Sequence, residues 1–379
     1  MGGFCFGADG GTRTRDLLIT NQLLYQLSHI SVAVHNKTII PQIPAFCNRF
    51  SENIFVKNHL YFPTNLQHIL IFGGKCGKIN VSYRKQVIPM NLTDIRTIKD
   101  IMSIYNIHFR KEFGQNFLTN ISVVEDIADS CSDTPDATVL EIGPGIGVLT
   151  QELAFRYNKV IAVEIDNGLI PVLRYTLQDC PEGVVEVVHA DVMKVNLAEL
   201  LAPAFAAGKV SVCANLPYYI TTPILMALLE SGLPFEYITI MIQSEVADRL
   251  CAKAGSKEYG AITAVLKYYG EAQKLFKVSA GNFIPAPKVD STVVRIKLHK
   301  EKPYVPKSEE ILFKTIRAAF EQRRKTLPNA LSAGFPEIPK DQLTAIIEAC
   351  GHRPDIRGER LDIVDFVALA DKIYDLKRV

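Results

Sequence analysis

The chain has 379 residues, 48% of them apolar, which is enough for two or three domains with a sizeable hydrophobic core. No run approaches the roughly 18 apolar residues of a membrane-spanning helix, and no compact apolar segment follows a basic start, so neither a membrane span nor a secretory signal is expected. The eight cysteines are scattered, with no CxxC pair and no zinc-ligand spacing, which indicates a reduced, cytoplasmic protein without a metal site.

The net charge of +2 is unevenly distributed along the chain. Residues 1–89 hold nine Lys or Arg and three Asp or Glu, which leaves 33 basic and 37 acidic residues in 90–379. The part from residue 90 onward therefore carries a charge of −4. Any contact with a nucleic acid must use local basic clusters rather than the global charge.

Residues 1–89 show neither helical nor strand periodicity, and prolines and glycines interrupt them. A coherent pattern begins at Met90, where Thr93 is placed to cap a helix that runs to about Tyr105. We expect Met90 to be the true start, with 1–89 a poorly structured leader that is not translated. The alternative is an organellar targeting peptide, since the leader is poor in acidic residues, although it lacks a clear amphipathic Arg-rich helix.

From residue 137, hydrophobic runs alternate with helical patterns. Seven strands are predicted, at 138–142, 160–164, 184–189, 210–214, 237–242, 273–278 and 292–298. Helical segments separate the first five, which is typical of βαβ units in a parallel sheet covered on both faces. The last two strands follow each other across a Pro-rich loop without a helix, which favours an antiparallel strand at that end.

After Pro303 and Pro306 the pattern becomes helical, over 309–321, 341–350 and 362–376. We therefore expect an α/β fold, with a doubly wound, seven-stranded, Rossmann-like domain over 90–300. A small all-α domain would occupy 301–379.

A glycine motif, Glu141–Gly147, directly follows the first strand and opens a helix. Gly143 and Gly145 would let the backbone turn sharply and approach a cofactor where a Cβ would collide, although the motif alone could be merely a tight turn. Glu164 ends the second strand, placed to accept ribose hydroxyls, and Asp191 follows the third, placed to accept from an adenine amine. Either acid alone could equally cap a helix, but together the three features mark one crevice at successive strand ends.

The spacing of the glycines distinguishes two kinds of cofactor. NAD would use a similar crevice, but the motif is GxGxG after an acid and lacks the GxGxxG spacing. S-adenosyl-L-methionine is preferred, because its cationic sulfonium suits the nearby acids.

The motif Asn215-Leu216-Pro217-Tyr218 ends the fourth strand at the same edge. The N6 amine of adenine is a poor nucleophile, because its lone pair is delocalised into the ring. The Asn215 side-chain oxygen and the Leu216 carbonyl, in a turn fixed by Pro217, would accept both N6 hydrogens and free that lone pair. Tyr218 can stack on a flipped base. Catalysis would then consist mainly of orientation for in-line attack, although these four residues alone could form an ordinary strand-end turn.

Phe283 lies in the Pro-rich loop between the last two strands. The neighbouring Pro285 and Pro287 would restrict the loop and hold the Phe283 ring against the other face of the base. A core or lid aromatic is the competing interpretation.

With these motifs the chain resembles the KsgA family of small-subunit ribosomal RNA adenine dimethyltransferases. The resemblance runs from about 108 to 361 and rests on 114–118, 141–147, 215–218, 283–291 and 322–327. It implies a class I methyltransferase fold in which Asn116 and Leu118 also contact S-adenosyl-L-methionine, with Gly143, Glu164, Asp191 and Asn215 at the other donor-binding positions. The implied reaction is dimethylation of two adjacent adenosines in the 3′-terminal hairpin loop of 16S rRNA, within an assembling small subunit. We expect a monomer.

Other functions share parts of this pattern. Resistance methylases of large-subunit (23S) rRNA have both active-site motifs, but the basic residues Arg323, Arg324 and Lys325, with Arg353, Arg357 and Arg360, favour the small-subunit substrate. A solvated helical face is the alternative for these charges. A ribosome-assembly factor that acts mainly by binding stays open, and a DNA N6-adenine methylase is disfavoured because no target-recognition domain is evident.

Overall fold

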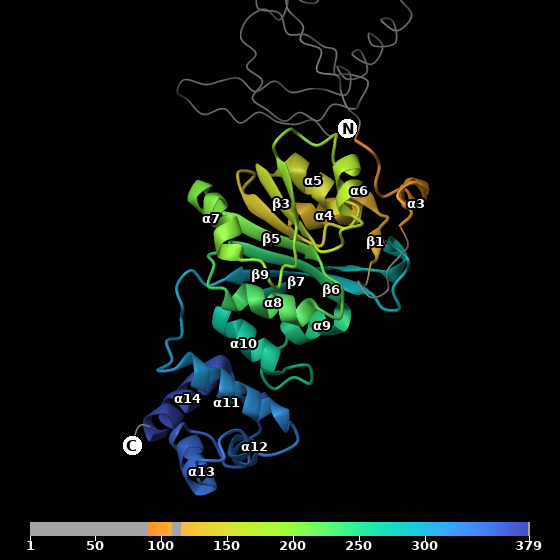
Figure 1. Cartoon of the computed structure of the whole chain (residues 1–379). Coiled ribbons are helices and arrows are strands. Elements are labelled where there is room, and N and C mark those ends of the chain that lie inside the picture. Colours follow the sequence, from red (N-terminus) through yellow and green to blue (C-terminus); the bar gives the residue numbers. More distant parts are fainter. Residues whose placement is uncertain (1–88, 108–114, 378–379) are drawn as a thin grey trace, which may run out of the picture. The chain divides into compact units, whose positions relative to one another are not determined.

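The computed structural model describes residues 89–107 and 115–377 (Figure 1). The chain divides into two units, Met1–Lys85 and Gln86–Val379, and all described residues belong to the second, which is compact. The expected leader therefore lies outside the described residues, as does Gly114 of the first motif. No helix in the described part of the chain is long and apolar enough to cross a membrane.

A seven-stranded sheet forms the centre of the second unit, in the order β4-β3-β2-β5-β6-β9-β7. Its strands are β2 (Thr138–Ile142), β3 (Lys159–Glu164), β4 (Val185–His189), β5 (Val210–Asn215), β6 (Tyr237–Gln243), β7 (Gly270–Val278) and β9 (Ser291–Leu298). Strands β2 to β6 pair in parallel, and β9 lies antiparallel between β6 and β7. The seven predicted strands and the antiparallel strand are thus confirmed.

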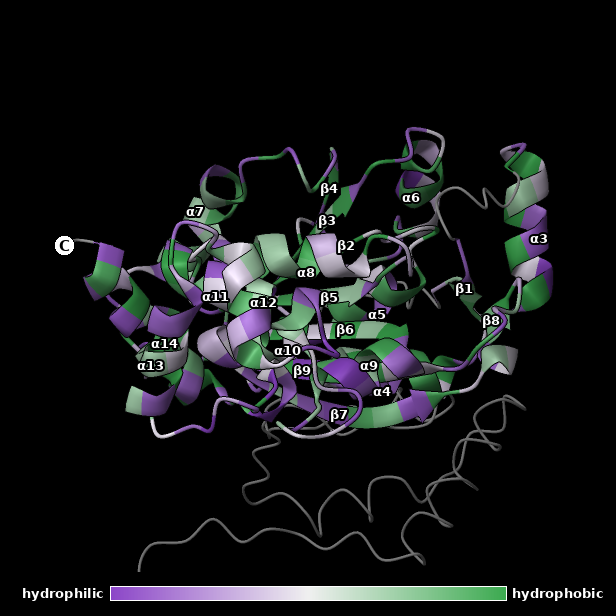
Figure 2. Ribbon diagram, turned by 90° about the horizontal axis from the view of Figure 1, so that it is seen from below, coloured by the Kyte–Doolittle hydropathy of each residue, from purple (hydrophilic) through white to green (hydrophobic). Residues whose placement is uncertain are grey.

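Helices cover both faces of the sheet, because alternate strand residues point to opposite sides. Val139 and Val160 lie in one apolar core with α3 (Ile95–Ile104), α4 (Ile121–Asp129), α5 (Val148–Arg156) and α6 (Ile170–Thr176). Leu140 and Ile161 lie in the other, with α7 (Leu197–Ala207), α8 (Thr221–Glu230), α9 (Ser244–Leu250) and α10 (Ala261–Tyr269). In Figure 2 the central strands β5 and β6 are mainly green, as expected for strands buried on both faces.

The cap of α3 differs from the prediction. Asp94 is the N-cap, and its Oδ1 accepts a hydrogen bond from the Arg96 N–H at 2.7 Å. Thr93 was wrongly predicted for this role, because both its N–H and its hydroxyl donate to Asn91 Oδ1, at 3.1 and 2.7 Å. The helix still ends next to Tyr105, as predicted.

The C-terminal region is helical, with α11 (Glu309–Glu321), α12 (Leu327–Gly334), α13 (Lys340–Ala349) and α14 (Ile363–Lys377). Helix α12 was not predicted. These helices enclose a third apolar core around Phe335 and Phe366, and α10 contributes Val265 and Tyr268 to it. The Tyr268 ring meets Phe313 of α11 edge to face, with centroids 5.4 Å apart. Helix α10 therefore packs both on the sheet and against the C-terminal helices.

Two short strands that the sequence did not predict join distant segments near the sheet. Strand β1 (Phe117–Leu118) pairs antiparallel with β8 (Phe283–Ile284), with Leu118 opposite Phe283. The Thr119 N–H extends the pairing by donating to the Asn282 carbonyl at 2.9 Å. The segment before α4 is thus fixed to the loop between β7 and β9.

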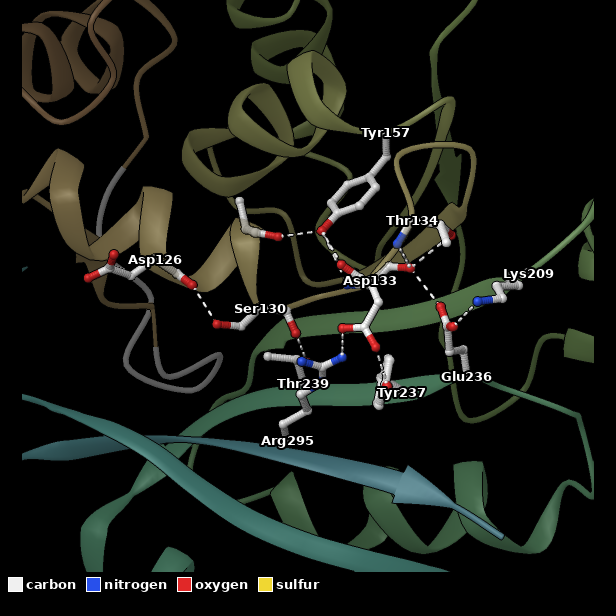
Figure 3. A network of polar contacts seen from close by, with 12 residues as sticks. Asp126, Ser130, Asp133, Thr134, Tyr157, Lys209, Glu236, Tyr237, Thr239 and Arg295 are labelled. Atoms are coloured by element: carbon white, nitrogen blue, oxygen red, sulfur yellow. Dashed lines mark hydrogen bonds and ion pairs between the residues drawn. The ribbon is translucent and has the colours of Figure 1, made fainter. Parts of the chain in front are cut away.

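A polar network fastens the loop between α4 and β2 to the sheet, near the amino ends of β5 and β6 (Figure 3). Asp133 accepts hydrogen bonds from the Tyr237 hydroxyl and the Arg295 guanidinium, and both hold the pKa of its carboxyl below the usual value. The Arg295 guanidinium also lies 3.4 Å from the centroid of the Tyr237 ring. The Ser132 hydroxyl donates to Glu236 at 2.6 Å, and Glu236 in turn pairs with Lys209.

Candidate active site

A pocket lies at the carboxyl ends of the parallel strands, opposite the polar network. Five segments converge on it, at 115–118, 141–145, 163–165, 190–192 and, in the last segment, at positions 215, 217, 219 and 220. Its walls include all seven residues predicted to bind the cofactor, Asn116, Leu118, Gly143, Gly145, Glu164, Asp191 and Asn215. The crevice predicted from strand-end residues is therefore a single pocket, as the rule for parallel sheets requires.

The glycine motif forms the floor of this pocket between β2 and α5. Gly143 and Gly145 have φ values of 71° and 62°, in the left-handed region that favours glycine. A Cβ on Gly145 would also lie 3.1 Å from Cε1 of Phe117, whereas one on Gly143 would meet nothing within 4 Å. The backbone conformation requires glycine at both positions, and at Gly145 the close approach of Phe117 adds to that requirement.

Glu164 is a buried carboxylate held by the backbone. Its Oε2 accepts from the Gly145 N–H at 3.1 Å, and its Oε1 accepts from the Asp166 N–H at 2.8 Å. Burial raises the pKa of Glu164, and these two hydrogen bonds oppose the rise. The side chain is thus fixed in the pocket wall against the glycine turn.

Glu141 is a second buried carboxyl in the pocket wall, only 2% exposed. Its Oε2 has no hydrogen-bond partner among the described residues. Burial raises the pKa of Glu141 to about 8, and the nearby Glu164 carboxyl adds to the rise. The sequence marked Glu141 only as the acid before the glycines, and the lack of a partner for its Oε2 was not foreseen.

Asp191 lines the pocket and also caps the turn that follows it. Its Oδ1 accepts from the Met193 N–H at 3.0 Å, and its Oδ2 lies 3.4 Å from Lys194 Nζ. Asp191 is therefore a pocket acid that also caps a turn; it does not cap a helix, because the next helix, α7, has Asn196 as its N-cap.

Asn215 ends β5 with its amide oriented by a neighbouring carbonyl. Its Nδ2 donates to the Asn116 carbonyl at 3.2 Å. The other end of the amide, Oδ1, is a hydrogen-bond acceptor. Leu216 donates its N–H to the Met241 carbonyl at 3.3 Å, while its own carbonyl accepts no hydrogen bond from the described residues. Pro217 lines the pocket beside them. Leu216 is buried and is not among the described residues that line the pocket, so Asn215 Oδ1 is the acceptor in the pocket wall and the Leu216 carbonyl belongs to the neighbouring residue.

Three aromatic residues near this corner have different environments. Tyr218 is half-buried, its hydroxyl lies 2.9 Å from Ser291 Oγ, and burial raises its pKa. Phe283 is 6% exposed and belongs to the first apolar core. Neither is among the described residues that line the pocket, whereas Tyr219, which the sequence did not single out, lines it and is 61% exposed. The burial of Phe283 agrees with the competing interpretation as a core aromatic.

The two basic clusters predicted from the sequence lie together. The Leu327 N–H donates to the Ile356 carbonyl at 2.7 Å, which joins the turn after α11 to the loop after α13. Arg323 Nε donates to Glu359 at 3.0 Å, and its Nη2 donates to the Lys257 carbonyl. Arg324 and Lys325 are exposed and form no ion pair with the described residues. Within the motif, Arg323 is therefore engaged internally and its two neighbours face solvent.

The parallel sheet with one antiparallel strand, and the pocket over its glycine turn, define a class I methyltransferase that uses S-adenosylmethionine. The family model described as Ribosomal RNA adenine dimethylase matches residues 106–352. The chain belongs to this family.

Relatives in sequence and structure agree with this assignment. The Ribosomal RNA small subunit methyltransferase A of Alkaliphilus metalliredigens is 43% identical over 275 residues, which covers 73% of this chain and 95% of the relative. That of Bacillus thuringiensis is 44% identical over 279 residues, 73% of this chain and 94% of the relative.

Two solved structures share the fold. A dimethyladenosine transferase from Plasmodium falciparum has a TM-score of 0.59 and 24% identity, over 69% of this chain and 98% of that chain. The 23S rRNA methyltransferase ErmE has a TM-score of 0.54 and 26% identity, over 68% of this chain and 99% of that chain.

Proposed function

We propose that this enzyme transfers methyl groups from S-adenosylmethionine to N6 of two adjacent adenosines in the 3′-terminal hairpin loop of 16S rRNA, and dimethylates each. The substrate would be an assembling small subunit in the cytoplasm, and the enzyme would act as a monomer. One observation carries the proposal: the Asn215 amide is fixed on the Asn116 carbonyl in the wall of the cofactor pocket. The residues that would bind the adenine amine and the residues that would bind the methyl donor therefore lie in one site.

The residues of the pocket fit the methyl donor. The cradle over Gly143 leaves room that a Cβ would otherwise enter, and the buried Glu141 Oε2, which has no partner among the described residues, would accept a hydrogen bond from a ligand bound in the pocket. Glu164 would bind the ribose hydroxyls, Asp191 the adenine amine, and Asn116 and Leu118 would cover the donor. When bound, the donor supplies an electrophilic methyl group.

The residues of the chain act on the amine that receives this methyl. Asn215 Oδ1 and the Leu216 carbonyl would accept the two N6 hydrogens, which draws the nitrogen toward a tetrahedral geometry and frees its lone pair. Pro217 fixes the turn that aims both acceptors. No strong general base is needed, since the product ammonium loses its proton readily, and the contribution of the protein is orientation. Tyr218 and Phe283 would support the base site from the half-buried and buried positions that they occupy.

The identity to the relatives favours a small-subunit substrate over a large-subunit one. The relatives named for the small subunit are 42–44% identical over nearly their whole length, against 26% for the 23S rRNA methyltransferase. We further propose that the helical region 301–379 contacts the rRNA through Arg324 and Lys325, whereas Arg323, which the sequence grouped with them, is held by Glu359 and the Lys257 carbonyl.

The test is transfer of labelled methyl from S-adenosylmethionine to unmethylated small subunits, followed by nucleoside mass spectrometry. We expect dimethyladenosine at two adjacent 3′-end positions. The Asn215→Ala variant should lose at least about a hundredfold in rate, because both orientation and an acceptor are removed. Label that enters only large-subunit RNA would refute the proposed substrate. Full rescue of growth by Asn215→Ala in a strain without the enzyme would instead favour an assembly role that depends on binding.

A further inference from the structure

A base outside its helix needs an aromatic or apolar surface to replace the stacking that it loses. Of the three aromatic residues near Asn215, Phe283 lies in the core and the Tyr218 hydroxyl is bound to Ser291. Tyr219 differs from both, because it lines the pocket and keeps 61% of its surface exposed. It is thus the aromatic ring of this corner that RNA can reach without any rearrangement.

The surroundings of Tyr219 do not explain its position. Its hydroxyl makes no hydrogen bond, and its ring makes no aromatic or cation–π contact, with the described residues. The ring lies in the lining of the cofactor pocket, two residues beyond Pro217, and its exposure at that place, rather than exposure alone, indicates a binding surface. An exposed tyrosine with few rotatable bonds loses little conformational entropy when a base stacks on it.

We propose that Tyr219 stacks on the adenine next to the one being methylated. This inference rests on the proposed function, in which two adjacent adenosines are substrates. While one adenine occupies the acceptors at Asn215 and Leu216, its neighbour must lie at the mouth of the pocket. Because Tyr219 lines the pocket and is largely exposed, we place its ring at that mouth, where it holds the waiting adenine rather than the reacting amine.

The test compares Tyr219→Ala, Tyr219→Phe and Tyr219→Leu in steady-state methylation of unmethylated small subunits. For Tyr219→Ala we expect KM for the subunit to rise about tenfold or more, the effect of removing one stacking aromatic, with kcat largely unchanged. Tyr219→Phe should restore the wild-type KM, because the hydroxyl has no partner, and Tyr219→Leu should fall between them. The control Tyr175→Ala removes a tyrosine that is 37% exposed on α6, outside the pocket lining, and should leave KM unchanged.

Binding of S-adenosylmethionine, measured by calorimetry on the same variants, distinguishes a ring that stacks on RNA from a ring that covers the methyl donor. Unchanged donor affinity together with the raised KM supports the proposal. A Tyr219→Ala variant that loses donor affinity, or that loses kcat at unchanged KM, would overturn it, since the ring would then cover the donor or orient the reacting base. A wild-type enzyme without activity on small subunits would refute the proposed function itself, whereas an active wild type with an equally active Tyr219→Ala variant would refute only this inference.

Discussion

Glu141 is the residue with the most perturbed chemistry in the pocket. Burial raises its pKa to about 8 from an ordinary value of 4.5. At a pH between these two values, Glu141 keeps its proton in the folded chain and has released it in the unfolded chain. The contribution of Glu141 to stability is therefore fully present below about pH 4.5 and is lost as the pH rises through about 8.

We predict that Glu141→Gln removes this pH dependence from the donor-free enzyme. Because glutamine does not ionise, the variant should gain stability relative to wild type by roughly 1 to 3 kcal/mol between pH 6 and pH 8.5, at about 1.36 kcal/mol per pH unit. Urea unfolding at several pH values measures the effect, with the exposed Glu271→Gln as control. Parallel pH profiles for wild type and Glu141→Gln would show that the Glu141 carboxyl titrates normally.

The sequence predicted those parts of the site that depend on local order. Asn215, Glu164 and Gly143 stand at fixed offsets from strand ends, so parallel strands bring them to one edge. The partners of Tyr218 could not be predicted, since Ser291 lies 73 positions away and meets it only because β9 returns beside β6. The same long-range packing decides that Tyr219, rather than Tyr218, reaches the pocket.

At the scale of elements, prediction succeeded where periodicity extends over several residues. Strands β2, β3, β5 and β6 of the central sheet are mainly apolar, and each of the seven strands was placed within about three residues of its bounds. Strands β1 and β8 have two residues each and therefore show no period, and their pairing spans the whole sheet domain. Helix α12 was missed because Pro328 and Gly334 suggest a loop, although proline is well tolerated in the first turn of a helix.

Helix α12 packs against α11 at its last residue, Gly334. A Cβ there would lie 2.4 Å from Cβ of Ala318, closer than two carbon atoms that are not bonded to each other can approach. We predict that Gly334→Ala destabilises the enzyme by about 1 to 3 kcal/mol through overpacking, partly offset by the better helix propensity of alanine. Thermal unfolding of Gly281→Ala provides the control, since a Cβ at Gly281 would meet nothing within 4 Å. Equal melting temperatures for the two variants would mean that α12 shifts without cost.

At the scale of the whole second unit, three loops meet at the basic surface, which is formed by Arg324 and Lys325 beside Arg323. The Gly255 N–H, from the loop between α9 and α10, donates to the Glu359 carbonyl at 2.7 Å, and Arg323 binds both the Glu359 carboxylate and the Lys257 carbonyl. Since α10 also packs against the C-terminal helices, the basic surface is attached to the catalytic sheet by buried contacts as well as by the chain. The guanidinium of Arg323 acts within this junction, while Arg324 and Lys325 are exposed beside it.

This arrangement predicts different consequences for neighbouring basic residues. The double variant Arg324→Ala, Lys325→Ala should bind small subunits more weakly and lower the slope of log affinity against log salt by about 1.4 to 1.8, because each of the two lost phosphate contacts removes about 0.7 to 0.9. Its melting temperature should not change. Arg323→Ala should instead lower the melting temperature slightly, because it removes two hydrogen bonds between loops, and exposed ion pairs of this kind contribute at most about 1 kcal/mol.

Affinity measured between about 50 and 300 mM salt, together with thermal unfolding, distinguishes the two roles. A double variant at the exposed Lys99 and Lys340 removes the same charge elsewhere and should keep the wild-type salt slope if the effect belongs to the basic surface. If that control lowers the slope as much as the Arg324 and Lys325 variant, binding follows the total charge of the molecule and the basic surface has no special role. An Arg323→Ala variant with unchanged stability and a lower slope would make Arg323 a phosphate contact, so that its bonds to Glu359 and Lys257 must open when RNA binds.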